Sequence, residues 1–209
     1  EFAYYSLMHL VDHCVSCHSR LAATSRPIFA ERLLARIDLK EIPPEDISQL
    51  YIATRQFNAA VKSLERHLLD KKLTPREADY SGLFIEYIRA AIVASKPVDD
   101  IIEFFEIYRA RNDVPIFLDK RLVFWNKALQ QLRGEISAQP KFQRAKAIFA
   151  NAHDLSRAPS NHLRAVHDLV AASIIRELLA LGVVTNDSEI AECYYMLGII
   201  SLRTAPRKA

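Results

Sequence analysis

Glycine is scarce in this sequence, with only 4 among 209 residues, and runs of β-branched residues are few. Alanine, leucine, glutamate, arginine and lysine are abundant instead, and these residues favour helices. Of all residues, 50% are apolar and 25% are charged, as in an ordinary globular protein with a hydrophobic core. The composition therefore predicts an all-α fold of one or two domains.

The chain also lacks several features that mark particular functions. Its apolar runs fall short of the roughly 18 residues that a membrane-spanning helix needs. Its net charge of +3 is spread along the sequence, without the Lys/Arg block and interleaved aromatics of a nucleic-acid-binding surface. It contains no nucleophile elbow, phosphate loop or H-E-x-x-H motif. We therefore expect no transmembrane segment, no nucleic-acid partner and no enzymatic activity.

Cysteine is rare too, but two of the 3 cysteines lie close together. The sequence from Cys14 to His18 is Cys-Val-Ser-Cys-His, the C-x-x-C-H signature of covalent haem attachment. The thiols of Cys14 and Cys17 can add to the two vinyl groups of one porphyrin, and His18 then lies where its imidazole can coordinate the iron. The third cysteine, Cys193, is predicted to be a buried apolar residue, so we expect no intramolecular disulfide.

Two other interpretations of the motif, a redox dithiol and a zinc site, fit the sequence less well. A thioredoxin-type dithiol belongs at a helix start within a βαβ pattern, and the chain has no such pattern. A structural zinc site needs four ligands, usually at paired spacing, and there is no second C-x-x-C. A chance occurrence of the motif in a haem-free helical scaffold stays open.

The residues around the motif, 3–20, carry apolar side chains at helical spacing and predict a helix. This arrangement resembles the N-terminal helix of small c-type cytochromes, and the likeness is specific in the five motif residues. The resemblance implies one covalent haem c, attached to Cys14 and Cys17, with His18 as the proximal iron ligand. Such haem is normally attached outside the cytoplasmic membrane. We therefore expect an exported protein, periplasmic or extracellular, whose targeting segment precedes this sequence.

The sixth iron ligand is left open by the sequence, with His67, His13 and His9 as candidates. His9 and His13 share the motif's helix, so they do not easily reach the opposite haem face and would rather serve a haem of a second chain. His67 lies on a later helix that can fold back over the haem. Surface positions are expected for three further histidines: His153, His162 and His167. Met196 is expected in the core.

Residues 44–75 have the pattern of a helix, a tight turn and a second helix, with Ala53 and Ala60 allowing close approach of the two helices. This resembles a tetratricopeptide repeat of about 34 residues. The match departs from the usual pattern at two places. Tyr51 stands where a glycine is common, and the turn contains Gln56 but no glycine. A second likeness lies near the C-terminus, where the Leu-Gly pair ends at Gly198.

These patterns divide the chain into three segments. The first, residues 1–42, is a haem-binding helical segment. The second, residues 43–133, consists of tetratricopeptide-like helix pairs, and the third, residues 140–209, of further helix pairs. Breaks are expected at Pro97, at a linker over residues 134–140, and at Gly182, which caps a helix over residues 162–181. The last helix lacks a partner in the sequence. We therefore expect that the natural chain continues or that another element covers its face.

The function predicted from these observations is one-electron transfer by a monohaem c-type cytochrome within a larger assembly or a homopolymer. Its partners would be redox proteins or copies of itself, docked on the helical repeats. The alternative is an interaction scaffold built from the repeats, whose haem is structural or senses redox state or gas. Ligand state separates the two, because an open sixth position binds small ligands and a second imidazole blocks them.

Overall fold

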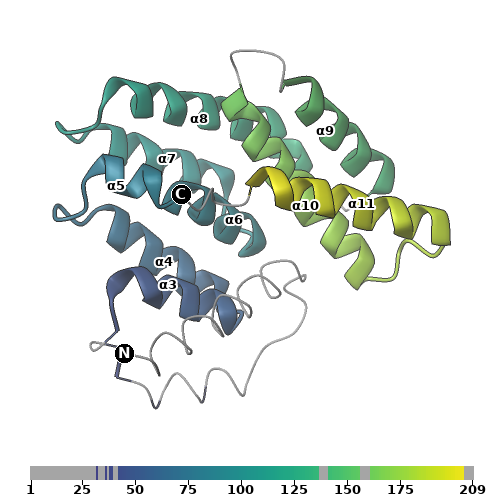
Figure 1. Cartoon of the computed structure of the whole chain (residues 1–209), viewed down its shortest axis with the longest axis horizontal. Coiled ribbons are helices and arrows are strands. Elements are labelled where there is room, and N and C mark those ends of the chain that lie inside the picture. Colours follow the sequence, from purple (N-terminus) through teal and green to yellow (C-terminus); the bar gives the residue numbers. More distant parts are fainter. Residues whose placement is uncertain are drawn as a thin grey trace.

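The computed structural model describes residues 42–136, 141–155 and 161–204, together with residues 32, 36, 38 and 39. Within these residues the chain forms nine α-helices and no strand (Figure 1), which confirms the predicted all-α fold. The helices, in chain order, are α3 Pro44–Ala53, α4 Phe57–Leu68, α5 Pro75–Tyr80, α6 Leu83–Val93, α7 Val98–Arg109, α8 Ile116–Ile136, α9 Phe142–Leu155, α10 Asn161–Ala180 and α11 Asp187–Thr204.

Local sequence accounts for where several helices begin. Helix α3 starts at Pro44, and proline suits a first helical position because its missing N–H would be unpaired there. Helix α5 starts with a capping box, in which the Glu77 N–H donates to the Thr74 hydroxyl at 3.3 Å and the Thr74 N–H donates to the Glu77 carboxylate at 3.0 Å. The predicted repeat pattern ended at residue 75, and the short helix α5 was not predicted.

Three helices end in the same way, with a residue in the left-handed conformation. These residues are Arg55 after α3, Ser95 after α6 and Gly182 after α10, with φ of 60°, 56° and 62°. At each end the N–H of the next residue bonds to a carbonyl five positions earlier, for example Lys96 to Ala91 at 2.9 Å. This is the Schellman arrangement. It confirms the predicted cap at Gly182 and places Arg55 in the turn that lacks glycine.

The predicted linker at Gly134 is wrong in its first residues, because α8 continues through Gly134 to Ile136. Leu132 is buried and holds the last turns of α8 against the core. Burial of this one side chain outweighs the low helix propensity of a single exposed glycine.

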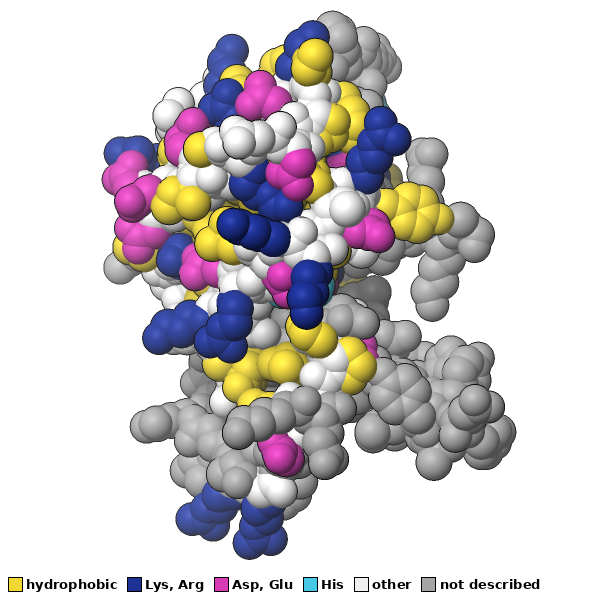
Figure 2. Space-filling view, turned by 90° about the vertical axis from the view of Figure 1, so that its left-hand side faces the viewer, with side chains coloured by type: hydrophobic (Ala, Val, Ile, Leu, Met, Phe, Trp, Pro, Cys, Tyr) yellow, Lys and Arg dark blue, Asp and Glu magenta, His cyan; other side chains and the backbone are white. Residues whose placement is uncertain are grey.

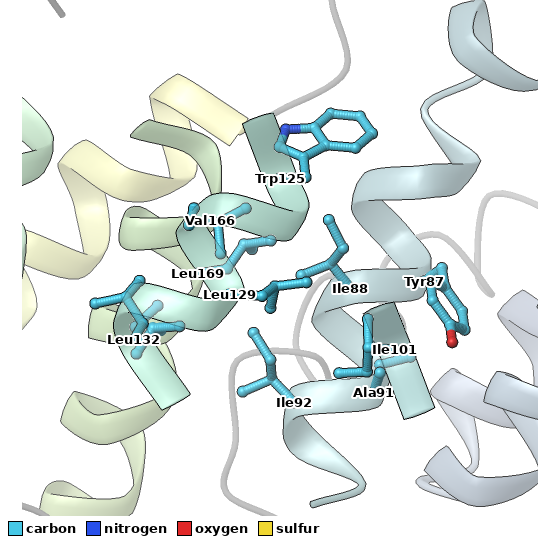
Figure 3. Packing of buried hydrophobic residues seen from close by; sticks show 14 of the residues in the cluster. Tyr87, Ile88, Ala91, Ile92, Ile101, Trp125, Leu129, Leu132, Val166 and Leu169 are labelled. Atoms are coloured by element: carbon cyan, nitrogen blue, oxygen red, sulfur yellow. The ribbon is translucent and has the colours of Figure 1, made fainter. Parts of the chain in front are cut away.

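Helix α10 is at the centre of the arrangement. It contacts α6, α8, α9 and α11, while α3 packs on α4, α4 on α6, α5 on α6 and α7 on α8. Figure 3 shows where α6, α8 and α10 meet: Ile88, Leu129 and Leu169 are directed toward one another. These side chains belong to a single buried cluster that extends from α3 to α11. The predicted segments 43–133 and 140–209 therefore share one hydrophobic core.

Candidate functional site

The proposed haem-binding residues Cys14, Cys17 and His18, and the ligand candidates His9 and His13, lie outside the described residues. Their roles therefore stay predictions from the sequence. Of the candidates for the sixth ligand, His67 is the one that the structure places.

His67 lies in the last turn of α4, between the buried side chains of Leu64 and Leu68, and is itself half-buried. Its Nδ1 atom is inaccessible to solvent and has no hydrogen-bond partner within the described residues. Buried polar atoms nearly always have a partner, so an imidazole nitrogen without one needs an explanation. Coordination of a metal and a hydrogen bond to a group outside the described residues are two explanations.

The other histidines differ in their surroundings. His153 is exposed, as predicted, with Nδ1 3.7 Å from the carboxylate of the adjacent Asp154. The predicted surface position of His167 is wrong, because its side chain is buried on α10 and its Nδ1–H donates to the Leu163 carbonyl at 2.9 Å. Burial lowers the pKa of the His167 imidazole, which keeps it neutral. The side chain of His162 is not among those that the structure describes.

Cys193 and Met196 are both buried on the side of α11 that faces the core, which confirms the two predictions of a core position. Burial raises the pKa of the Cys193 thiol, and the nearby carboxylates of Glu192 and Glu189 raise it further. A buried, protonated thiol is neither a good nucleophile nor a metal ligand. Neither residue is placed to serve a cofactor on the surface.

Asp168 is a charged group in the interior that the sequence analysis did not identify. Its side chain is fully buried on α10, with Oδ1 3.3 Å from the guanidinium of Arg203 on α11 and Oδ2 unpaired within the described residues. The same guanidinium lies 5.1 Å from the ring centre of Phe149 on α9. Burial raises the pKa of Asp168 to about 6, against the opposing effect of Arg203 and Arg164. The Arg203 guanidinium of α11 therefore contacts both α10, at Asp168, and α9, at Phe149.

The described residues give little sign of other kinds of site. They contain no group of three or more His, Cys, Asp or Glu side chains placed to bind a metal ion. None of the helices that the structure describes is both long and apolar enough to cross a membrane. On the face shown in Figure 2, Lys and Arg side chains are interspersed with Asp and Glu, so that face has no extended basic surface.

Comparison with known proteins leaves the family of this chain open. No protein family, curated protein or solved structure matches it.

Proposed function

We propose that this protein is a monohaem c-type cytochrome that transfers single electrons within a larger protein assembly or a polymer of its own copies. The observation that carries the proposal is the sequence Cys14-x-x-Cys17-His18. Haem c, when bound, supplies an iron that changes oxidation state by one electron. The two thiols hold the porphyrin covalently, and the His18 imidazole ligates the iron and sets its orientation.

The chemistry of this donor set suits haem better than a dithiol or zinc. Cys193, the remaining cysteine, is buried on the core side of α11, where its raised pKa disfavours the thiolate that a metal site needs. Zinc is the main rival, because His9 and His13 stand at H-x-x-x-H spacing directly before the cysteines. Structural zinc sites usually draw their ligand pairs from separate segments of chain, whereas these four residues fall in one segment predicted to be helical.

For the sixth position, we propose His67. Its Nδ1 has no partner within the described residues, so that nitrogen can coordinate iron without first breaking a hydrogen bond. A methionine ligand is less well supported, since Met196 is 1% exposed in the core and Met8 belongs to the apolar stripe of the helix predicted over residues 3–20. Two imidazole ligands give a lower reduction potential than imidazole with thioether.

The helices after the motif would supply the docking surface, as tetratricopeptide-like arrays do for other proteins. Transfer over distance by a single haem requires another redox centre nearby, in a partner or in a second copy. Haem attachment outside the cytoplasmic membrane places the protein in the periplasm or outside the cell.

An optical spectrum tests the proposal first, recorded on protein purified from its native exported form in the oxidised, reduced, and reduced plus CO states. We expect Soret absorption and sharp reduced bands that CO leaves unchanged. The double variant Cys14→Ser/Cys17→Ser should lose covalent haem on a denaturing gel, whereas the control Cys193→Ala should keep it. Zinc without Soret absorption would contradict the proposal.

The ligand assignment has its own test. Removal of the sixth ligand opens the iron, so His67→Ala should convert a CO-insensitive spectrum into one that shifts with CO. The control is His153→Ala, on an exposed histidine of α9, which should leave the spectrum unchanged. A shift with CO in the unmodified protein would mean an open site and would favour the scaffold whose haem senses gas.

A further inference from the structure

Helix α11 has an apolar face on each side. Cys193, Met196 and Ile200 are buried against the core, where α11 contacts α10. On the opposite side, Tyr194 is 63% and Tyr195 64% exposed, and three further exposed residues extend this surface: Ala191, Gly198 and Leu202. Figure 1 shows α11 on the near side of the molecule. We call the residues Ala191, Tyr194, Tyr195, Gly198 and Leu202 the outer face of α11.

Large exposed apolar side chains along one side of a helix indicate that another element packs there. The spacing of the outer face indicates what kind of element this is. Ala191, Tyr195, Gly198 and Leu202 follow one another at intervals of four, three and four residues, which is the heptad spacing of a helix–helix seam. The outer face therefore fits a long helix that lies along α11.

The outer face is also complementary to itself. When two copies of α11 pack antiparallel about a two-fold axis between positions 196 and 197, Ala191 faces Leu202 of the other copy and Tyr195 faces Gly198. Each layer of the seam then pairs a small residue with a large one, so the side chains interdigitate. A parallel pairing would instead set Tyr195 against Tyr195 and leave a gap between the two glycines.

Gly198 fits this arrangement in a second way. Glycine within a helix is destabilising, and nothing among the described atoms lies within 4 Å of where its Cβ would be, so no intramolecular crowding requires a glycine. It leaves a notch on the surface that the ring of Tyr195 from another copy can enter.

We propose that a second copy of this chain occupies the outer face of α11, forming a two-fold antiparallel helix pair. Helix α11 has 18 residues and is about 27 Å long, and the seam from Ala191 to Leu202 takes up only about 17 Å of it, so the buried area is small for a protein–protein interface. The association is therefore reversible and dependent on concentration. A two-fold contact closes on itself, so it gives dimers rather than filaments. The inference uses no property of the haem.

Sedimentation equilibrium on the full chain tests whether it dimerises. The chain concentration is varied between about 1 and 200 µM, the range in which a weak dimer forms. We expect a monomer–dimer equilibrium. Tyr195→Glu and Gly198→Gln should each raise the dissociation constant by about tenfold or more, since each disrupts the central layer. Two matched controls should change the dissociation constant less than about twofold: Tyr80→Glu, on a tyrosine 78% exposed at the end of α5, and Gly134→Gln, on a glycine of α8.

Stability measurements separate lost association from misfolding. Gly198→Gln should raise the melting temperature of the monomer, because glutamine is a better helix former than glycine and has space at this position. A monomer at every concentration, or a dimer that both outer-face variants leave intact, would overturn the inference. A chain that dimerises as expected but carries no haem would refute the proposed function and leave this inference standing.

Discussion

Replacing Asp168 by asparagine should change how the stability of this protein depends on pH. Asp168 is fully buried, and among the described residues Arg203, at 3.3 Å, is its charged partner across the helix interface. Burial raises the pKa of Asp168 from 3.8 to about 6, although Arg203 and Arg164 favour its ionised form. The free-energy cost of removing the ionised carboxylate from water is therefore larger than the stabilisation by the ion pair with Arg203.

The sign and size follow from the two pKa values. Between pH 4 and 6 the unfolded chain has already released this proton while the folded protein still holds it. The folded state then binds more protons, so the free energy of unfolding falls as the pH rises through this range. A difference of about 2 in pKa corresponds to about 3 kcal/mol. Asparagine is neutral and nearly isosteric, so Asp168→Asn removes this loss.

Urea unfolding at several pH values from 4 to 7.5 measures the effect. We expect the stability of Asp168→Asn relative to the unmodified protein to increase by about 3 kcal/mol from pH 4 to 7. Glu86, whose pKa burial raises to about 7, titrates in both proteins and cancels in the comparison. The control Asp154→Asn removes a charge from a side chain 82% exposed and should shift stability by less than about 0.5 kcal/mol. A difference that stays constant, or falls as the pH rises, would refute the reasoning.

Two further predictions concern packing and backbone conformation. Leu129→Ala, at a fully buried position where α6, α8 and α10 meet, should lower the free energy of unfolding by about 3 kcal/mol in urea titrations. Leu69→Ala, at a leucine 41% exposed, should cost less than about 1 kcal/mol, and similar losses would contradict the core assignment. Ser95→Gly should stabilise by up to about 1 kcal/mol because φ is 56° there, whereas Ser81→Gly, at φ −71°, should destabilise. Thermal unfolding followed by circular dichroism distinguishes the two signs, and the same sign for both would count against the backbone argument.

Helix starts and stops were predictable where one residue determines the local backbone. Pro44 begins α3 and Gly182 ends α10 because each restricts or permits a particular φ. The linker predicted to begin at Gly134 was wrong because a single glycine disfavours a helix only weakly. The burial of Leu132 is enough to keep this part of the chain helical. Helix α5 was missed although Thr74 and Glu77 form the Thr-x-x-Glu pattern of a capping box, a signal that the sequence does contain.

The burial of the interior polar residues was harder to predict from the sequence, because it depends on how many other helices pack against the helix that carries them. Asp168 and His167 are both buried, since α10 contacts four other helices and has no wide solvent-facing side. The sequence of α10 did contain a related signal. Its apolar residues are distributed over nearly every side of the helix, as they are in a buried helix. The partner of Asp168 could not be inferred, because Arg203 lies 35 residues away in sequence.

The position of α10 also bears on the tetratricopeptide resemblance. In a linear array each helix pair contacts only the pairs next to it. Here α10 contacts α6 as well as α8, so the C-terminal helices pack against an earlier pair and not only against their neighbour in sequence. The described helices then share one core, and loss of a buried side chain such as Val166 removes contacts where α10 meets its neighbours. We therefore expect the described helices to unfold as one cooperative unit rather than repeat by repeat, because one buried cluster extends from α3 to α11 and α10 contacts four other helices.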